Sequence, residues 1–117
     1  MKVLVAGDFC QRFRVNEKIE QKKFGSMFDA IKPIISSCDI KVVNFEFPIV
    51  TETGEPIEKI GPTLEGSEFA VEAIKYAGFN VCTLANNHIL DQGEACCLET
   101  KDLLEKGGIF TVGVGID

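Results

Sequence analysis

Long hydrophobic runs are absent from this sequence. No apolar stretch in its 117 residues approaches the roughly 20 residues that a membrane-spanning helix needs. The first eight residues carry one lysine and then a short apolar run that ends at a charged residue, a pattern typical of a first β-strand and not of a signal peptide. From the sequence we therefore predict no membrane segment and expect a cytoplasmic location.

Basic residues are also scarce. The sequence has 12 Lys and Arg against 18 Asp and Glu, which gives a formal net charge of -6. Proteins hold nucleic-acid phosphates with clustered Lys and Arg, so we expect no nucleic-acid partner. The acidic balance is compatible with a cation site, although most carboxylates on such a chain simply solvate helix faces.

Paired metal-binding cysteines and a glycine-rich phosphate loop are both missing. The five cysteines are an odd number without zinc-type pair spacing: Cys10, Cys38, Cys82, Cys96 and Cys97. We predict reduced thiols that pack mostly as small hydrophobes. The turn after the first predicted strand reads Gly-Asp-Phe-Cys-Gln-Arg-Phe, without the glycines that let a backbone approach a pyrophosphate. A Rossmann-like nucleotide-binding domain therefore explains this sequence poorly.

The apolar segments that are present predict an α/β fold. Four of them, rich in β-branched residues, predict β-strands at 2–7, 40–45, 79–85 and 109–112. The first lacks alternation, as expected of a strand covered on both faces. Helices are predicted from near residue 26, at about 67–77 and at about 93–106. This alternation indicates right-handed βαβ crossovers, a parallel sheet and a single domain over residues 1–117.

Helix boundaries follow from local signals. Ser26 and Asp29 have capping-box spacing, and Pro33 should kink this first helix or break it near residue 32. Gly78 should end the second helix, and Asp91 is the expected N-cap of the third. The segment 48–66 is too long for an ordinary connection between a strand and a helix, so we expect a functional or mobile loop.

Polar side chains follow three of the predicted strands. The first ends at Asp8, the second runs into Glu46, and the third ends at Asn87 and His88. The carboxyl ends of parallel strands meet at one edge of a sheet, where ligands collect. Carboxylate, amide and imidazole groups bind manganese, zinc or iron, and metal-assisted hydrolases use the same groups. The sequence therefore predicts a metal site at this edge.

Each of these residues also has a structural explanation. Asp8 is able to end a strand by accepting hydrogen bonds from turn amides, and Glu46 to be a solvated loop residue. Asn86 and Asn87 suit turn geometry, and a lone histidine such as His88 is often structural. The coincidence favours a site, since three successive strands that each end in such a group are less expected by chance than any one of them.

Three ordered motifs resemble one known family. They are Gly-Asp-Phe at 7–9, Asn-Phe-Glu-Phe-Pro at 44–48 and Ala-Asn-Asn-His-Ile-Leu-Asp-Gln-Gly at 85–93, the last followed by a helix and Gly-Val-Gly at 113–115. Together, over nearly the whole chain, they are similar to the poly-gamma-glutamate capsule biosynthesis proteins of the CapA type. That family is a branch of the calcineurin-like metallophosphoesterase superfamily.

The resemblance implies a fold and a set of roles. It implies a layered sandwich of two sheets flanked by helices, to which this chain gives the first βαβαβαβ half, so that the domain looks truncated at its C-terminal end. Asp8 would be the first-strand metal ligand, Glu46 the carboxylate that bridges two ions, Asn87 the amide ligand and His88 the catalytic imidazole. The implied partners are a capsule polymer, its precursor or a capsule-synthesis complex, and relatives are often exported or membrane-anchored.

Two departures from the superfamily pattern bear on activity. Cys10 stands where a histidine ligand is usual, and the sequence has no histidine besides His88. The leading hypothesis is a metal-dependent hydrolase that acts on a phosphoester or a glutamyl amide. The alternative is a catalytically silent binding or scaffolding module. A half-sandwich would expose a sheet edge and apolar surface, so we also expect self-association.

Overall fold

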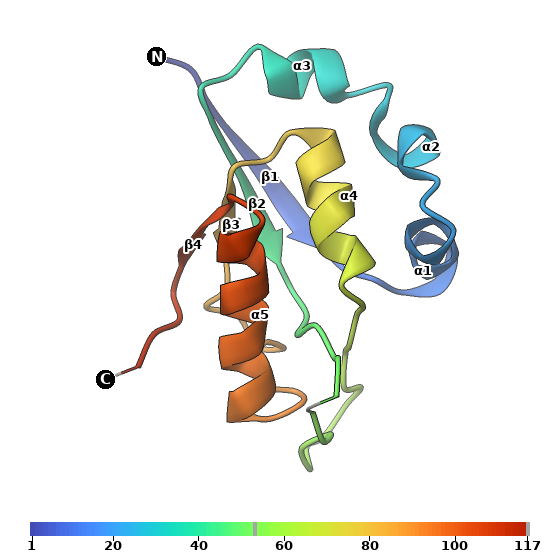
Figure 1. Cartoon of the computed structure of the whole chain (residues 1–117), viewed down its shortest axis with the longest axis vertical. Helices are drawn as coiled ribbons and strands as arrows, with labels where there is room; N and C mark the ends of the chain where they lie inside the picture. Colours follow the sequence, from blue (N-terminus) through green and yellow to red (C-terminus); the bar gives the residue numbers. More distant parts are fainter. Residues whose placement is uncertain (53, 117) are drawn as a thin grey trace.

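Four parallel strands alternate with helices along the chain, as the sequence predicts (Figure 1). This computed structural model describes residues 1–52 and 54–116. The elements in chain order are β1 (Val3–Phe9), α1 (Phe13–Glu20), α2 (Phe24–Phe28), α3 (Lys32–Ser36), β2 (Ile40–Phe45), α4 (Phe69–Ala77), β3 (Val81–Thr83), α5 (Glu94–Lys106) and β4 (Phe110–Val112). In the described residues, none of the helices is both long enough and apolar enough to cross a membrane.

The sheet has one covered face and one open face. Its strand order is β1-β2-β3-β4, so every crossover steps in the same direction. Right-handed crossovers that all step one way place their helices on one side of the sheet. On that side Val43 and Cys82 are buried, whereas Val5 and Phe110 on the opposite side are 73% and 74% exposed. The prediction that the first strand is covered on both faces is therefore wrong within the described chain.

A β-bulge in β1 determines which face of the sheet the side chains at the end of that strand occupy. Val5 pairs with Val42, but the next aligned pair is Asp8 with Asn44, so β1 advances three residues while β2 advances two. The extra residue turns Asp8 to the same face as Val5. It also aligns Phe9 with Phe45, and both rings are buried among the core side chains. One inserted residue thus sends Phe9 into the core and Asp8 to the open face.

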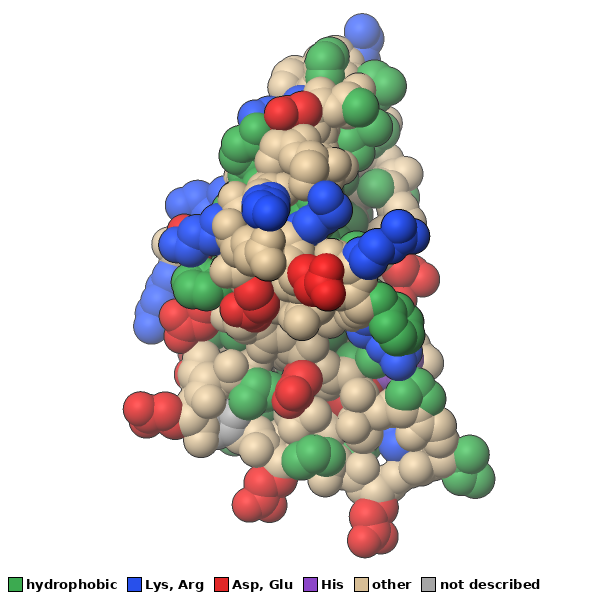
Figure 2. Space-filling model, turned by 90° about the vertical axis from the view of Figure 1, so that its right-hand side faces the viewer, with side chains coloured by type: hydrophobic (Ala, Val, Ile, Leu, Met, Phe, Trp, Pro, Cys, Tyr) green, Lys and Arg blue, Asp and Glu red, His purple; other side chains and the backbone are tan. Residues whose placement is uncertain are grey.

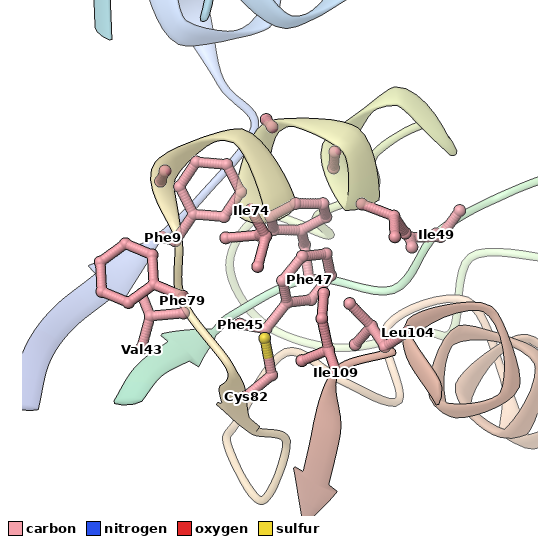
Figure 3. Close-up of a cluster of buried hydrophobic side chains, with 14 of the residues drawn as sticks. Phe9, Val43, Phe45, Phe47, Ile49, Ile74, Phe79, Cys82, Leu104 and Ile109 are labelled. Atoms are coloured by element: carbon pink, nitrogen blue, oxygen red, sulfur yellow. The ribbon is translucent and has the colours of Figure 1, made fainter. Parts of the chain in front are cut away.

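The core lies between the sheet and the helices and is rich in phenylalanine (Figure 3). The ring centroids of Phe45 and Phe47 are 4.2 Å apart, and Phe9 lies 5.9 Å from Phe45 and 5.7 Å from Phe47. Ile74 from α4 and Leu104 from α5 are fully buried in the same cluster. These contacts fix the carboxyl ends of β1 and β2 against the two longest helices.

The connection between β1 and β2 differs from the single helix predicted there. Two short helices, α2 and α3, replace the single helix expected from near Ser26, and α1, which precedes them, was not predicted at all. Ser26 lies inside α2 and its hydroxyl donates to the Lys23 carbonyl, so the expected capping box is wrong. Pro33 stands in the first turn of α3, where its missing N–H costs nothing. The predicted break near residue 32 is therefore confirmed.

The other two helices match their predictions more closely. α4 ends at Gly78, which has a left-handed φ of 99° as the C-cap. α5 begins after Gly93, which is its N-cap, so the prediction that Asp91 caps this helix is wrong. The predicted strand at 79–85 is shorter in the structure, where β3 covers Val81–Thr83.

The long segment between β2 and α4 is anchored at both ends. An isolated parallel bridge joins Ile49 to Gly66, and the Thr100 hydroxyl of α5 accepts a hydrogen bond from the Ile49 amide at 2.8 Å. Gly66 packs against the Phe47 ring so closely that an added Cβ would lie 2.2 Å from a ring carbon. The ends of the segment are therefore part of the packed structure.

All five cysteines are unpaired, as predicted from their spacing. Cys82, Cys96 and Cys97 are buried, and Cys10 and Cys38 are half-buried. Burial raises the pKa of the Cys82 thiol to about 12. The buried cysteines therefore act as small apolar residues.

Charged side chains of both signs share the surface beside α1 and α2. Figure 2 shows Lys and Arg side chains across the middle of this face, with Asp and Glu side chains next to them and toward the lower end. The lower end corresponds to the loop between β2 and α4 in Figure 1.

Candidate functional site

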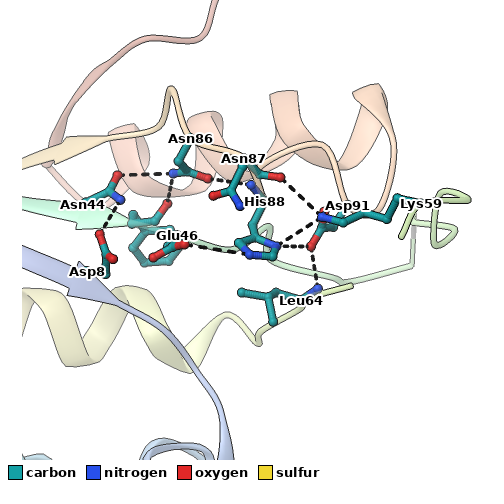
Figure 4. A network of polar contacts seen from close by, with 10 residues as sticks. Asp8, Asn44, Glu46, Lys59, Leu64, Asn86, Asn87, His88 and Asp91 are labelled. Carbon is teal, nitrogen blue, oxygen red and sulfur yellow. Dashed lines mark hydrogen bonds and ion pairs between the residues drawn. The ribbon is translucent and has the colours of Figure 1, made fainter. Parts of the chain in front are cut away.

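A row of polar side chains crosses three strands at the carboxyl end of the sheet (Figure 4). Asp8 of β1 is aligned with Asn44 of β2, which is aligned with Thr83 of β3. The Asn44 amide donates to the Asp8 carboxylate at 2.8 Å, and its oxygen accepts from the Thr83 hydroxyl at 3.0 Å. The row depends on the bulge in β1, since without the extra residue Gly7 would stand opposite Asn44.

Asn86 ties the loop after β3 to this row. Its amide group donates to the Phe45 carbonyl at 2.9 Å and to the Asn44 side chain at 3.3 Å. Its side-chain oxygen accepts from the backbone amide of His88 at 3.1 Å. The Asn86 side chain therefore fixes the backbone position of His88.

Glu46 reaches the site because both of its neighbours enter the core. Phe45 and Phe47 are fully buried, and alternation along an extended segment turns Glu46 to the opposite side. Burial raises the pKa of Glu46, and the nearby Asp8 carboxyl raises it further. Hydrogen bonds from Asn44 and Glu46 lower the pKa of Asp8. The two carboxyls are therefore coupled, and Glu46 takes up a proton at a higher pH than Asp8 does.

His88 lies between two carboxyl groups. Its Nε2 is 3.8 Å from a Glu46 oxygen, and its Nδ1 is 2.7 Å from an Asp91 oxygen. The ring is largely buried, with 14% of the side chain exposed. Asp8, Glu46 and His88 are thus brought together, in that order, along one edge of the sheet (Figure 4).

Asp91 is the most deeply buried charged group of this cluster. One of its oxygens accepts from the Lys59 ammonium at 2.6 Å, and the other accepts from the Leu64 amide at 2.6 Å. Burial would raise the pKa of Asp91, but the hydrogen bonds from Lys59, Leu64 and His88 outweigh it and hold the pKa below the usual value. The carboxylate is therefore ionised at neutral pH.

Two other residues considered in the sequence analysis, Asn87 and Cys10, have different surroundings. Asn87 adjoins His88, but its side chain is exposed and makes no hydrogen bond to any residue the structure describes; only its carbonyl is contacted, by Lys59 at 3.4 Å. Cys10 is half-buried and directly follows β1. Burial, and then the charge of Glu46, raise the pKa of its thiol.

The donors at this edge suit a divalent cation but do not complete its coordination. Within residues 1–52 and 54–116, no group of three or more His, Cys, Asp and Glu side chains is arranged to hold a metal ion. The paired carboxyls of Asp8 and Glu46 are oxygen donors of the type that divalent cations take. The fit is therefore that of a partial ligand set.

Sequence reasoning missed five side chains of this network: Asn44, Lys59, Thr83, Asn86 and Asp91. The motif Asn-Phe-Glu contains Asn44, but only strand register shows that it faces Asp8. Asp91 precedes a helix, which is the usual position of a capping residue, and nothing local signals that it turns inward. Lys59 lies in the long loop, 29 residues before His88, so its approach depends on the fold.

Comparison with known proteins identifies the family. The family model described as bacterial capsule synthesis protein PGA_cap matches residues 2–117. The chain belongs to this bacterial capsule synthesis family. A relative called capsule biosynthesis protein CapA from Bacillus anthracis is 28% identical over 117 residues, which are 98% of this chain and 28% of the relative.

Two further relatives are similar to this chain. The PGA biosynthesis protein CapA of Bacillus subtilis (strain 168) is 28% identical over 109 residues, covering 93% of this chain and 29% of that protein. The uncharacterized protein y4sH of Sinorhizobium fredii is 33% identical over 93 residues, covering 75% of this chain and 20% of that protein. The chain thus spans less than a third of the length of these relatives.

Proposed function

We propose that this chain carries part of a metal-dependent hydrolase site that acts in capsule synthesis. The observation that supports it is the order of Asp8, Glu46 and His88 along the sheet edge, with two carboxyls in contact and an imidazole 3.8 Å from one of them. Two neighbouring carboxylates repel each other, and a cation between them would relieve that repulsion. The proposed cation is manganese, zinc or iron, and two ions are expected in a complete site.

The residues of the chain have distinct roles in this proposal. Asp8, whose pKa the Asn44 hydrogen bond lowers, and Glu46 would hold the metal, with the exposed Asn87 amide as a further ligand. A bound divalent cation would supply a more acidic water and neutralise developing negative charge. The Nε2 atom of His88 faces the same space, and its lone pair would accept a proton from a water molecule and pass that proton to the leaving group. Asn86 would keep the imidazole in place through the backbone of His88.

The proposed substrate is a phosphoester or a glutamyl amide of a capsule polymer. The name of the Bacillus subtilis relative, a PGA biosynthesis protein, points to poly-gamma-glutamate, which carries many negative charges. The chain has a net charge of -6, so an anionic polymer would be repelled from this edge unless metal ions lay between the two. Bound metal would therefore serve in binding as well as in chemistry.

A second candidate is a catalytically silent module that binds or scaffolds other capsule-synthesis components. The incomplete donor set in the described part of the chain favours this alternative. Self-association is a further expectation, because β1 and β4 are edge strands and Val5 and Phe110 are exposed on the open face. Sedimentation velocity over a range of concentrations tests it, and a monomer at all of them would refute it.

The first test of the hydrolase proposal is calorimetric titration of the protein with manganese and with zinc. We expect binding that Asp8→Asn and Asn87→Ala each weaken at least tenfold, whereas Asn16→Ala on α1 leaves it unchanged. Hydrolysis of a generic phosphodiester and of a glutamyl amide would then be measured with the bound metal. Absence of binding to either metal would refute the hydrolase and leave the silent module.

A further inference from the structure

A chain of charged contacts links the long loop to the imidazole. Lys59 and Leu64 belong to the segment between β2 and α4, and both donate to Asp91, which in turn contacts His88 (Figure 4). The Asp91 side chain is 1% exposed and the Lys59 side chain 21% exposed. These contacts lie behind the ring, on the side away from Glu46.

The ionised carboxylate of Asp91 determines which nitrogen of the His88 ring carries the hydrogen. An ionised carboxylate has no proton to donate, so an imidazole nitrogen that hydrogen-bonds to it must carry the hydrogen. The Nδ1 atom of His88 lies 2.7 Å from the Asp91 oxygen, a normal hydrogen-bond distance. Lys59 and the Leu64 amide meanwhile stabilise the charge on Asp91. In the neutral ring Nε2 is then the unprotonated nitrogen, facing Glu46.

We propose that Asp91 is a positioning residue that holds His88 in the tautomer with hydrogen on Nδ1 and so presents the Nε2 lone pair to the site. The value of this arrangement for catalysis rests on the proposed hydrolase function, whereas the tautomer itself does not. Lys59 and Leu64 extend the effect to the loop, because both donate to this carboxylate, and the Lys59 ammonium also lies 3.4 Å from Nδ1 of His88. A change in the loop would therefore change the hydrogen bonding of the His88 ring.

A purely structural role for Asp91 predicts something different. If Asp91 served only to join the loop to the segment before α5, its hydrogen bonds to Lys59 and Leu64 would suffice and the ring would be free to adopt either tautomer. The contact to Nδ1 at 2.7 Å excludes that freedom. The tautomer therefore separates positioning from simple anchoring.

The experiment is nitrogen-15 NMR of the imidazole, which is unambiguous because His88 is the sole histidine. Protonated and unprotonated ring nitrogens resonate in separate regions, and their couplings to the ring protons tell Nδ1 from Nε2. The spectrum is recorded at a pH where the ring is neutral, first for the wild type and then for Asp91→Asn. Asp29→Asn is the matched control, since Asp29 also accepts a side-chain hydrogen bond, from Tyr76, in a different part of the molecule.

We expect the wild type and Asp29→Asn to show hydrogen on Nδ1, and Asp91→Asn to show a mixture or mainly hydrogen on Nε2. A wild-type spectrum with hydrogen on Nε2 overturns the proposal without any variant, so a variant that fails to fold does not protect it. An unchanged tautomer in folded Asp91→Asn also overturns it. The metal titration is independent: failure to bind metal refutes the hydrolase, while the tautomer alone decides the role of Asp91.

Discussion

The two adjacent asparagines of the third motif should respond very differently to the same substitution. Asn86 makes side-chain hydrogen bonds to Asn44, to the Phe45 carbonyl and to the His88 amide, whereas the exposed Asn87 side chain makes none to the described residues. At about 1 kcal/mol for each lost hydrogen bond, Asn86→Ala should lower the free energy of unfolding by about 2–4 kcal/mol. Asn87→Ala should change it by less than about 0.5 kcal/mol.

The assay is urea unfolding followed by circular dichroism on both variants and the wild type. Asn86→Ala should lower the transition midpoint with little change in slope, and its thermal midpoint should fall by on the order of 10 °C. Asn87→Ala should unfold like the wild type yet lose metal binding. Equal destabilisation by the two substitutions would refute this division between a structural and a ligand asparagine, and so would an Asn86→Ala variant as stable as the wild type.

Three further predictions concern packing, thiol reactivity and pH. Gly66→Ala should lower the free energy of unfolding in urea by about 1–3 kcal/mol, because the added Cβ would overlap the Phe47 ring. The control is Gly7→Ala, whose added Cβ meets no atom within 4 Å and should not cause that loss. Similar losses for the two variants would argue against the overlap. Cys82, with its pKa raised to about 12, should resist alkylation at pH 8 until the protein unfolds, which mass spectrometry would show. The pKa of Asp91 is lower in the folded protein than in the unfolded chain, where it is near 4, so ionised Asp91 stabilises the fold above about pH 4. This stability is lost as the pH falls through the folded pKa, so the stability of the wild type should fall more steeply in acid than that of Asp91→Asn. Parallel curves of stability against pH would contradict this.

The parts of the fold that sequence reasoning predicted well are those set by local chemistry. The apolar stripe of α4 followed by Gly78 was sufficient to locate that helix and its end. The break at Pro33 followed from the missing N–H of proline. Asp8, Glu46 and His88 were expected at one edge because parallel strands share that edge, and the structure brings the three together.

The parts that were missed depend on pairing between distant segments. The bulge at the end of β1 is visible only as a register difference between β1 and β2, although Gly7 is a residue type common at bulges. Exposure of Val5 depends on the direction of every crossover and not on the composition of its strand. The inward turn of Asp91 depends on Lys59, and no local pattern connects two residues that lie so far apart in the chain.

The strand order has a consequence for how the protein emerges from the ribosome. Each strand pairs with the one made just before it, so the sheet grows from β1 to β4 in the order of synthesis and no early strand waits for a late partner. Every intermediate chain length therefore exposes the newest strand as a free edge, while the carboxyl ends of β1 and β2 are already aligned. Asp8 and Asn44 should meet on the nascent chain before the loop that holds His88 has been translated.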